Sequence, residues 1–273
     1  MTKLYFLSIY NIYDNLIKGD YLNIMNKYIL IIAVLFSNII FGYNQTFKVG
    51  EYIKYDVLAQ VPEFNVSGKV GILEAKVLAI SNVNGIPAYH LYAHVYTTGA
   101  ANWLYKVSDV FEAWVSTNDF KPIFLTKDTF EGDWTNKESL DFQGKNYYLF
   151  NDKRTVDEKI EFNGMAFDAL SLVFFMRFVD KNIGTFKVNW LEGKNVKKDI
   201  RFTIEDGEDL KTKLQREKLS TVRVYEKDKY GTDALISKDK YNQVPLDVII
   251  AEQKVYGLTI RVRGIIREYK DGK

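Results

Sequence analysis

The sequence contains no cysteine, only two histidines and only four prolines among its 273 residues. The absence of cysteine excludes disulfides, thiolate metal sites and thiol nucleophiles, so stability must come from packing. It also excludes the lipid anchor of bacterial lipoproteins, which requires a cysteine at the cleavage point. Basic and acidic residues nearly balance, at 37 and 35. This balance predicts no binding to nucleic acid, which usually needs a clustered basic surface.

What the chain does contain is ample material for a core. Hydrophobic residues make up 47% of the sequence and aromatic residues 15%. The charged fraction of 26% is ordinary for a folded domain and does not indicate disorder. The length is large for one domain, but all-β sandwiches and barrels reach it as single units.

A short apolar run near the N-terminus indicates export. Tyr28–Phe41 is apolar along most of its length, Lys27 precedes it and Gly42 follows it. Such a run is shorter than the roughly 20 residues that cross a bilayer, and it fits the apolar region of a secretory signal peptide. We therefore expect cleavage near residue 42, no membrane span afterwards, and a periplasmic or envelope location. The initiator is then either Met1 or Met25. A buried core helix and an uncleaved anchor are the alternatives.

From residue 43 to residue 273 the sequence predicts a single β-rich domain. Apolar and polar residues alternate with period two, the pattern of strands with one buried face. The clearest runs are Ile53–Ala59, Tyr89–Val95, Phe186–Trp190, Ile200–Ile204 and Leu258–Val262. Glycine and asparagine separate the runs and mark short turns. The fold class is therefore mainly β, with one curved antiparallel sheet or a half-open barrel.

One segment departs from this alternation. Residues 166–179 are apolar nearly all round a helical projection, which predicts one helix buried against the sheet. Its buried charges, Asp168 and Arg177, lie about 13.5 Å apart along a helix axis and cannot pair with each other. Each needs another partner, because an unpaired buried charge is costly. Asp168 can accept backbone donors at the helix start, whereas Arg177 can hold strand carboxylates or carbonyls, or an anionic ligand.

Four segments, in this order, resemble a family of exported Gram-negative envelope proteins catalogued as domain of unknown function 3108. They are FKVGEYIKYDV (Phe47–Val57), YKVSDVFEAWVSTNDFKPIFL (Tyr105–Leu125), FDALSLVFFMRF (Phe167–Phe178), and Ser237 with Asp239 and Pro245. The resemblance covers roughly residues 47–264. It implies a curved antiparallel sheet with one helix and an exported location, but no established activity. The chain departs from the family in lacking a Trp before the final Ser-x-Asp, where it has Leu235 and Ile236.

The sequence contains no recognisable catalytic or metal motif. His90 and His94 fall on a predicted strand, where this spacing separates them by about 13 Å, too far to share one ion. The acidic turn Glu205–Asp209 lacks the spacing of a helix–loop–helix calcium site. There is no phosphate-binding glycine loop, nucleophile elbow or Ser-His-Asp arrangement. We therefore predict no enzymatic activity, no cofactor and no metal site.

Three functional hypotheses remain. The first is a non-enzymatic binding or interaction protein, with Arg177, Asp168, Phe174 and Trp114 as ligand-binding candidates and a lipid or an envelope protein as the partner. The second is a carrier that holds an acyl chain of a lipid or lipoprotein between sheet and helix, suggested by the aromatic content. An interface filled by side chains would argue against it. The third is a hydrolase using carboxylates such as Asp109, Asp128, Asp168 and Asp239. The ligand, the partner and the oligomeric state stay open.

Overall fold

The computed structural model describes residues 47–143, 146–150, 156–161, 165–177, 180, 182, 184–192, 195–226, 233–255 and 258–272. The apolar run Tyr28–Phe41 therefore lies outside the described residues. The strands are β1 (Tyr52–Val61), β2 (Val66–Val83), β3 (Ile86–Thr97), β4 (Ser108–Ser116), β5 (Pro122–Glu131), β6 (Trp134–Gln143), β7 (Asn146–Phe150), β8 (Val156–Glu161), β9 (Ala166–Phe167), β10 (Thr185–Glu192), β11 (Asn195–Asp206), β12 (Leu210–Lys211), β13 (Lys218–Leu219), β14 (Thr221–Glu226), β15 (Asp233–Ser237), β16 (Pro245–Val255) and β17 (Leu258–Lys270). The helices are α3 (Gly99–Leu104) and α4 (Ala169–Phe175), with 3-10 turns η1 (Pro62–Phe64) and η2 (Tyr241–Gln243).

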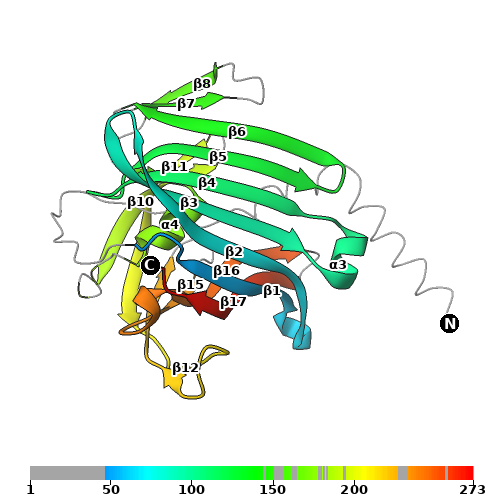
Figure 1. Cartoon of the computed structure of the whole chain (residues 1–273). Helices are drawn as coiled ribbons and strands as arrows, with labels where there is room; N and C mark the ends of the chain where they lie inside the picture. The colour runs from blue at the N-terminus through cyan, green and yellow to red at the C-terminus, as the bar shows by residue number, and fades with distance from the viewer. Residues whose placement is uncertain are drawn as a thin grey trace.

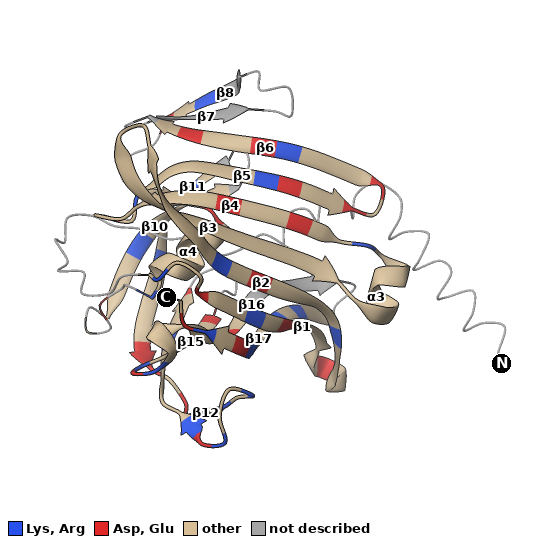
Figure 2. Ribbon diagram, in the orientation of Figure 1, with Lys and Arg blue, Asp and Glu red and all other residues tan. Residues whose placement is uncertain are grey.

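Of the described strands, fifteen form one large sheet, in the order β8-β7-β6-β5-β4-β3-β2-β1-β17-β16-β15-β14-β11-β10-β9. Neighbouring strands are antiparallel except at one edge, where β9 runs parallel to β10. The sheet curves around α4 and does not close, because β8 and β9 are its two edges (Figure 1). The prediction of a mainly β chain with one large curved sheet is confirmed. Acidic and basic residues are interspersed over the strands and do not gather by sign (Figure 2).

The predicted helix is shorter than the apolar run suggested. Ala166 and Phe167 form strand β9, and α4 begins only after Asp168. Asp168 has extended backbone and accepts the backbone N–H of Ser171 at 2.8 Å, while Ser171 Oγ accepts the backbone N–H of Asp168 at 3.1 Å. This reciprocal capping box stops the helix from extending backwards. The prediction that Asp168 accepts backbone donors at the helix start is confirmed.

Replacing Asp168 with alanine is expected to lower the free energy of unfolding by about 1–2 kcal/mol, the usual cost of losing an N-cap acceptor. Asp168→Asn keeps an acceptor oxygen and should lose clearly less. Urea denaturation near neutral pH measures both variants against the wild-type chain. Equal losses in the two variants would contradict the capping role.

The core lies between α4 and the inner face of the sheet. Phe174 packs edge-on against Phe47, with 5.1 Å between ring centroids, and Phe47 in turn contacts Phe120 at 5.6 Å. Phe175 stacks on Phe167 at 4.7 Å. These side chains belong to one continuous cluster of buried residues that joins the helix to strands from both halves of the sheet. Among the described residues, the aromatic side chains of α4 therefore pack directly against those of the sheet.

The part of the chain that the structure describes contains no helix long and apolar enough to cross a membrane.

Candidate functional site

A buried ion pair lies at the C-terminal end of α4. Arg177, just beyond the helix, is 1% exposed. Its Nη2 lies 2.6 Å from Oε1 of Glu51, and its Nε donates to the backbone carbonyl of Asn242 at 3.0 Å. Asn242 also donates its side-chain amide to Oε2 of Glu51 at 3.2 Å. Arg177 therefore holds a carboxylate and a carbonyl, as one of the two sequence interpretations proposed, but neither comes from a strand: Glu51 precedes β1 and Asn242 lies in η2.

Aromatic rings enclose this ion pair. The guanidinium carbon of Arg177 lies 4.6 Å from the ring centroid of Phe47 and 5.4 Å from that of Phe174. Nearby, the hydroxyl of Tyr55 donates to the carbonyl of Pro245 at 2.8 Å. Burial raises the pKa of Glu51, and the charge of Arg177 opposes that rise. The network leaves almost no exposed surface on Arg177 at which a ligand could bind.

The four ligand-binding candidates do not form one site. Phe174 and Arg177 are in contact, whereas Asp168 caps the opposite end of α4. Trp114 alternates along β4 with buried core residues, so it points to the face of the sheet turned away from α4. There it stacks on His90, with 4.1 Å between ring centroids. His90 and His94 both lie on strand β3, as predicted.

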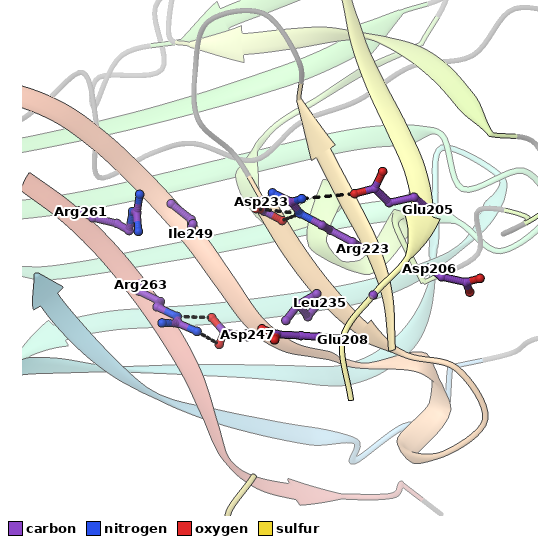
Figure 3. Close-up of a pocket in the computed structure, with 11 residues that line it drawn as sticks. Glu205, Asp206, Glu208, Arg223, Asp233, Leu235, Asp247, Ile249, Arg261 and Arg263 are labelled. Carbon is purple, nitrogen blue, oxygen red and sulfur yellow. Dashed lines mark hydrogen bonds and ion pairs between the residues drawn. The ribbon is translucent and has the colours of Figure 1, made fainter. Parts of the chain in front are cut away.

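A charged pocket lies on the outer face of the sheet, the face turned away from the core (Figure 3). Val222, Val224, Ala234, Ile236 and Val248 of β14 to β16 are buried, so the residues that alternate with them point outward. Cross-strand pairing aligns the outward residues, with Arg223 opposite Leu235 and Leu235 opposite Asp247. The pocket has a volume of about 350 Å³. It is lined by Glu205, Asp206, Gly207, Glu208, Arg223, Asp233, Leu235, Asp247, Ile249, Arg261 and Arg263.

Two arginine–aspartate pairs form the floor of this pocket. Nε of Arg223 lies 3.0 Å from both carboxylate oxygens of Asp233, and its Nη2 lies 2.6 Å from Oδ2. Arg263 binds Asp247 in the same two-pronged way, with Nε 2.6 Å from Oδ1. The carboxylates raise the pKa of both arginines. Such paired planar groups are held in fixed orientation, which makes the floor rigid.

The rim of the pocket is acidic. Glu205 accepts from Nη1 of Arg223 at 3.2 Å, and Lys238 forms an ion pair with Asp206. That lysine lowers the pKa of Asp206. The lining residues comprise five carboxylates and three arginines, and with Lys238 paired to Asp206 the local excess is one negative charge. The acidic segment Glu205–Asp209, predicted as a turn, supplies three of those carboxylates, although Glu205 and Asp206 end strand β11.

Comparison with known proteins places the chain in a family. Residues 55–261 match the family described as "Protein of unknown function (DUF3108)". The chain belongs to this family. The resemblance inferred from the four sequence segments is therefore confirmed. No curated protein matches the sequence.

One solved structure shows the same fold as this DUF3108 chain. It is a β-barrel-like protein of the domain of unknown function DUF1849 from Brucella abortus, with a TM-score of 0.52 and 8% sequence identity. The alignment covers 84% of this chain and all (100%) of the other. MucB in complex with MucA(peri) also aligns, over 82% of this chain and 94% of that one at 9% identity. Its TM-score is only 0.14, so it carries no argument about fold or partner.

Sequence reasoning missed Glu51 and Asn242 as the partners of Arg177 in this DUF3108 protein. A signal was nevertheless present, because the network draws on three of the four segments that resemble the family. Phe47 and Glu51 come from the first segment, and Phe174 and Arg177 from the third. Asn242 lies between Ser237 and Pro245, in the fourth. The segments share a location in the fold, which their separation in the sequence conceals.

A second pocket of about 480 Å³ lies beside β9. It is lined by Ile86, Ser116, Asn118, Asp119, Lys121, Pro122, Ile123, Phe142, Met165 and Ala166. One part of its wall is apolar and the other consists of polar turn residues. It reaches β9 but includes no residue of α4, so it is not the cleft between sheet and helix that an acyl-chain carrier was expected to have.

The carboxylates considered for hydrolysis do not meet in either pocket. Asp128 is exposed and forms an ion pair with Lys137, and Asp239 is exposed near the end of β15. Asp168 caps α4, and Asp109 is completely buried. Among the residues described, no group of three or more His, Cys, Asp or Glu side chains is placed to hold a metal ion.

Proposed function

We propose that this DUF3108 protein is exported and acts in the cell envelope as a non-enzymatic binding protein, with the charged pocket of β11 and β14 to β17 as its binding surface. The observation that carries this proposal is a rigid floor of paired Arg and Asp side chains beneath an acidic rim. Ligand sites commonly combine a preformed concave surface with a few fixed polar groups.

The charge of the pocket favours a cationic ligand. Arg223 and Arg263 each bind a carboxylate in a two-pronged arrangement, so the charges within these two pairs largely offset each other. Glu205, Asp206 and Glu208 at the rim add negative charge. An ammonium or guanidinium group of a partner, such as a lysine-rich peptide segment, is complementary to this surface.

A binding role is better supported than a catalytic one. A general acid needs a raised pKa, but Lys238 lowers the pKa of Asp206. Asp233 and Asp247 each accept hydrogen bonds from an arginine, so their oxygens are already occupied. The acyl-carrier alternative finds its best support in the pocket beside β9, since the aromatic side chains of α4 pack directly against those of the sheet. That pocket is partly polar, which favours the charged pocket as the binding surface.

Binding of a pentalysine peptide tests the proposal. The triple variant Glu205→Gln, Asp206→Asn, Glu208→Gln should bind the peptide at least tenfold more weakly than the wild-type chain, a change of about 1.4 kcal/mol. The effect should shrink as salt is added, because exposed charges are screened. Isothermal titration calorimetry measures both affinities.

The matched control is Asp128→Asn, which removes an exposed carboxylate outside the pocket. It should leave pentalysine binding unchanged. Equal weakening by the control and by the triple variant would show a general charge effect and would contradict a specific site. Equal binding of pentaglutamate by the wild-type chain would also contradict it.

A further inference from the structure

Two carboxyl groups, those of Asp109 on β4 and Glu131 at the end of β5, lie buried beside each other. The pairing of Val110 with Asp128 and of Val107 with Glu131 places Asp109 directly opposite Thr129 on the neighbouring strand. Because alternate residues of a strand share a face, the side chains of Asp109, Thr129 and Glu131 point the same way. They are 0%, 0% and 1% exposed, respectively.

Most polar atoms of these side chains have no hydrogen-bond partner among the described residues. The backbone N–H of Phe130 donates to Oδ1 of Asp109 at 3.1 Å. In the part of the chain that the structure describes, Oδ2 of Asp109 and both oxygens of Glu131 accept no hydrogen bond, and the hydroxyls of Thr129 and Tyr105 have no partner. Two adjacent carboxylates cannot bond to each other, and burying them uncompensated is costly. One proton between them turns an acceptor into a donor and removes one negative charge.

The charges around the pair favour one bound proton. Lys127, on the same face of β5, attracts both carboxylates, whereas Asp128 next to it repels Asp109. Burial raises the pKa of the Tyr105 hydroxyl, and the charges of the two carboxylates add to the rise. Both facing strands present uncharged residues, from β3 (Val95, paired with Asp109) and from β6 (Asn136, paired with Thr129). One lysine balances only one of the two carboxylates.

Burial shifts the titration of Asp109 and Glu131 toward neutral pH. It raises the pKa of Asp109 to about 6. It also raises the pKa of Glu131 to about 7, with the charge of Asp109 contributing to the rise. The ionisation state of the pair therefore changes over the range in which external pH commonly varies.

The pair lies beside two turns that contact each other at this end of the sheet. The β3–β4 connection, residues 98–107, contacts the β5–β6 turn through the backbone N–H of Gly132, which donates to the carbonyl of Lys106 at 2.8 Å. The ring of Tyr105 lies so close to Gly132 that a Cβ there would come within 3.1 Å of it. The connection also contains α3, whose Trp103 and Leu104 are 86% and 58% exposed.

We propose that Asp109 and Glu131 bind one proton between them, and that losing it separates the β3–β4 connection from the β5–β6 turn at the Gly132–Lys106 hydrogen bond. Two ionised carboxylates in contact repel each other, and Glu131 sits next to the Gly132–Lys106 hydrogen bond. A calcium ion is less well matched than a proton, because it takes six to eight oxygen ligands and this cluster offers only two carboxyls and two hydroxyls.

Amide hydrogen exchange tests the proposal. At about pH 8 the amides of Gly132 and Val107 should exchange at least tenfold faster than at about pH 5.5, after correction for the intrinsic pH dependence of exchange. In Glu131→Gln, which keeps a donor for Asp109, the corrected rates should be the same at both pH values. The amide of Ile204, hydrogen-bonded to the backbone carbonyl of Gly184 in the other half of the sheet, serves as an internal control.

Three results would overturn the proposal. The first is equal corrected exchange in the wild-type chain at both pH values. The second is restored protection at about pH 8 on adding about 1 mM Ca²⁺, which would identify a cation as the ligand. The third, which does not depend on any variant folding, is the absence of a protonated carboxyl band in the infrared spectrum of the wild-type chain at about pH 6, where exposed carboxyls are ionised.

Discussion

Replacing Arg177 with methionine is expected to lower the free energy of unfolding by about 3–5 kcal/mol, the usual cost of removing one partner from a buried ion pair. The variant leaves Glu51 1% exposed without its cation, and it removes the contact with Phe47 and Phe174. Methionine retains much of the apolar volume, so the loss reports the charge more than the packing. Urea denaturation near pH 7 measures it.

Two companion variants make this result specific. Lys137→Met breaks an exposed ion pair with Asp128 and should change stability by less than about 1 kcal/mol. Adding Glu51→Gln to Arg177→Met removes the orphaned charge and should recover part of the loss. If Arg177→Met costs no more than Lys137→Met, the buried ion pair of Arg177 and Glu51 does not contribute to stability as expected.

The free energy of unfolding is expected to fall by on the order of 3 kcal/mol between about pH 5 and about pH 8. Burial raises the pKa of Asp109 and Glu131 to about 6 and about 7, above their ordinary values of 3.8 and 4.5. The folded state thus binds more protons than the unfolded state between about pH 4 and about pH 7. The stabilisation is complete below the unfolded pKa values and is lost as the pH rises through the folded ones.

Burial lowers the pKa of His94, which opposes this slope in part, but the other carboxyl groups do not reverse it. Burial also raises the pKa of Glu51 and of Asp168, which gives the same sign. Lys213 and Lys69 lower the pKa of Asp56 to about 2, so its contribution disappears only in more acidic solution. Glu131→Gln should therefore flatten the slope measured by urea denaturation over this pH range. An unchanged slope in that variant would assign the effect to other groups.

The sequence was sufficient for the local features of the fold. Period-two alternation located strands such as Ile200–Ile204 because one face of each is buried. The rule that a buried charge needs a partner predicted the roles of Asp168 and Arg177, and those roles follow from short-range chemistry. The apolar run 166–179 overstated the helix, because composition alone does not show that a capping residue interrupts the run.

Pairings between distant segments could not be predicted. Glu51 meets Arg177, and Asp109 meets Glu131, only because the register of the strands brings them together. Nothing in the local sequence of Glu131 distinguishes it from an exposed turn residue. The charged pocket is a similar case, since its Arg and Asp residues lie on adjacent strands whose order in the sheet is a tertiary property.

The junction of β1 and β17 has a consequence for how the chain folds. Tyr52 pairs with Lys270 and Gln60 with Arg261, so the first and last strands meet at the middle of the sheet. The strands on either side of this junction connect mostly to neighbours close in sequence and can assemble locally. Joining the two halves demands the largest loop closure in the molecule, which slows folding. Until the last residues are available, β1 is an open edge of ten residues. During synthesis, this strand is therefore the natural point for chaperone binding or for mispairing with another chain.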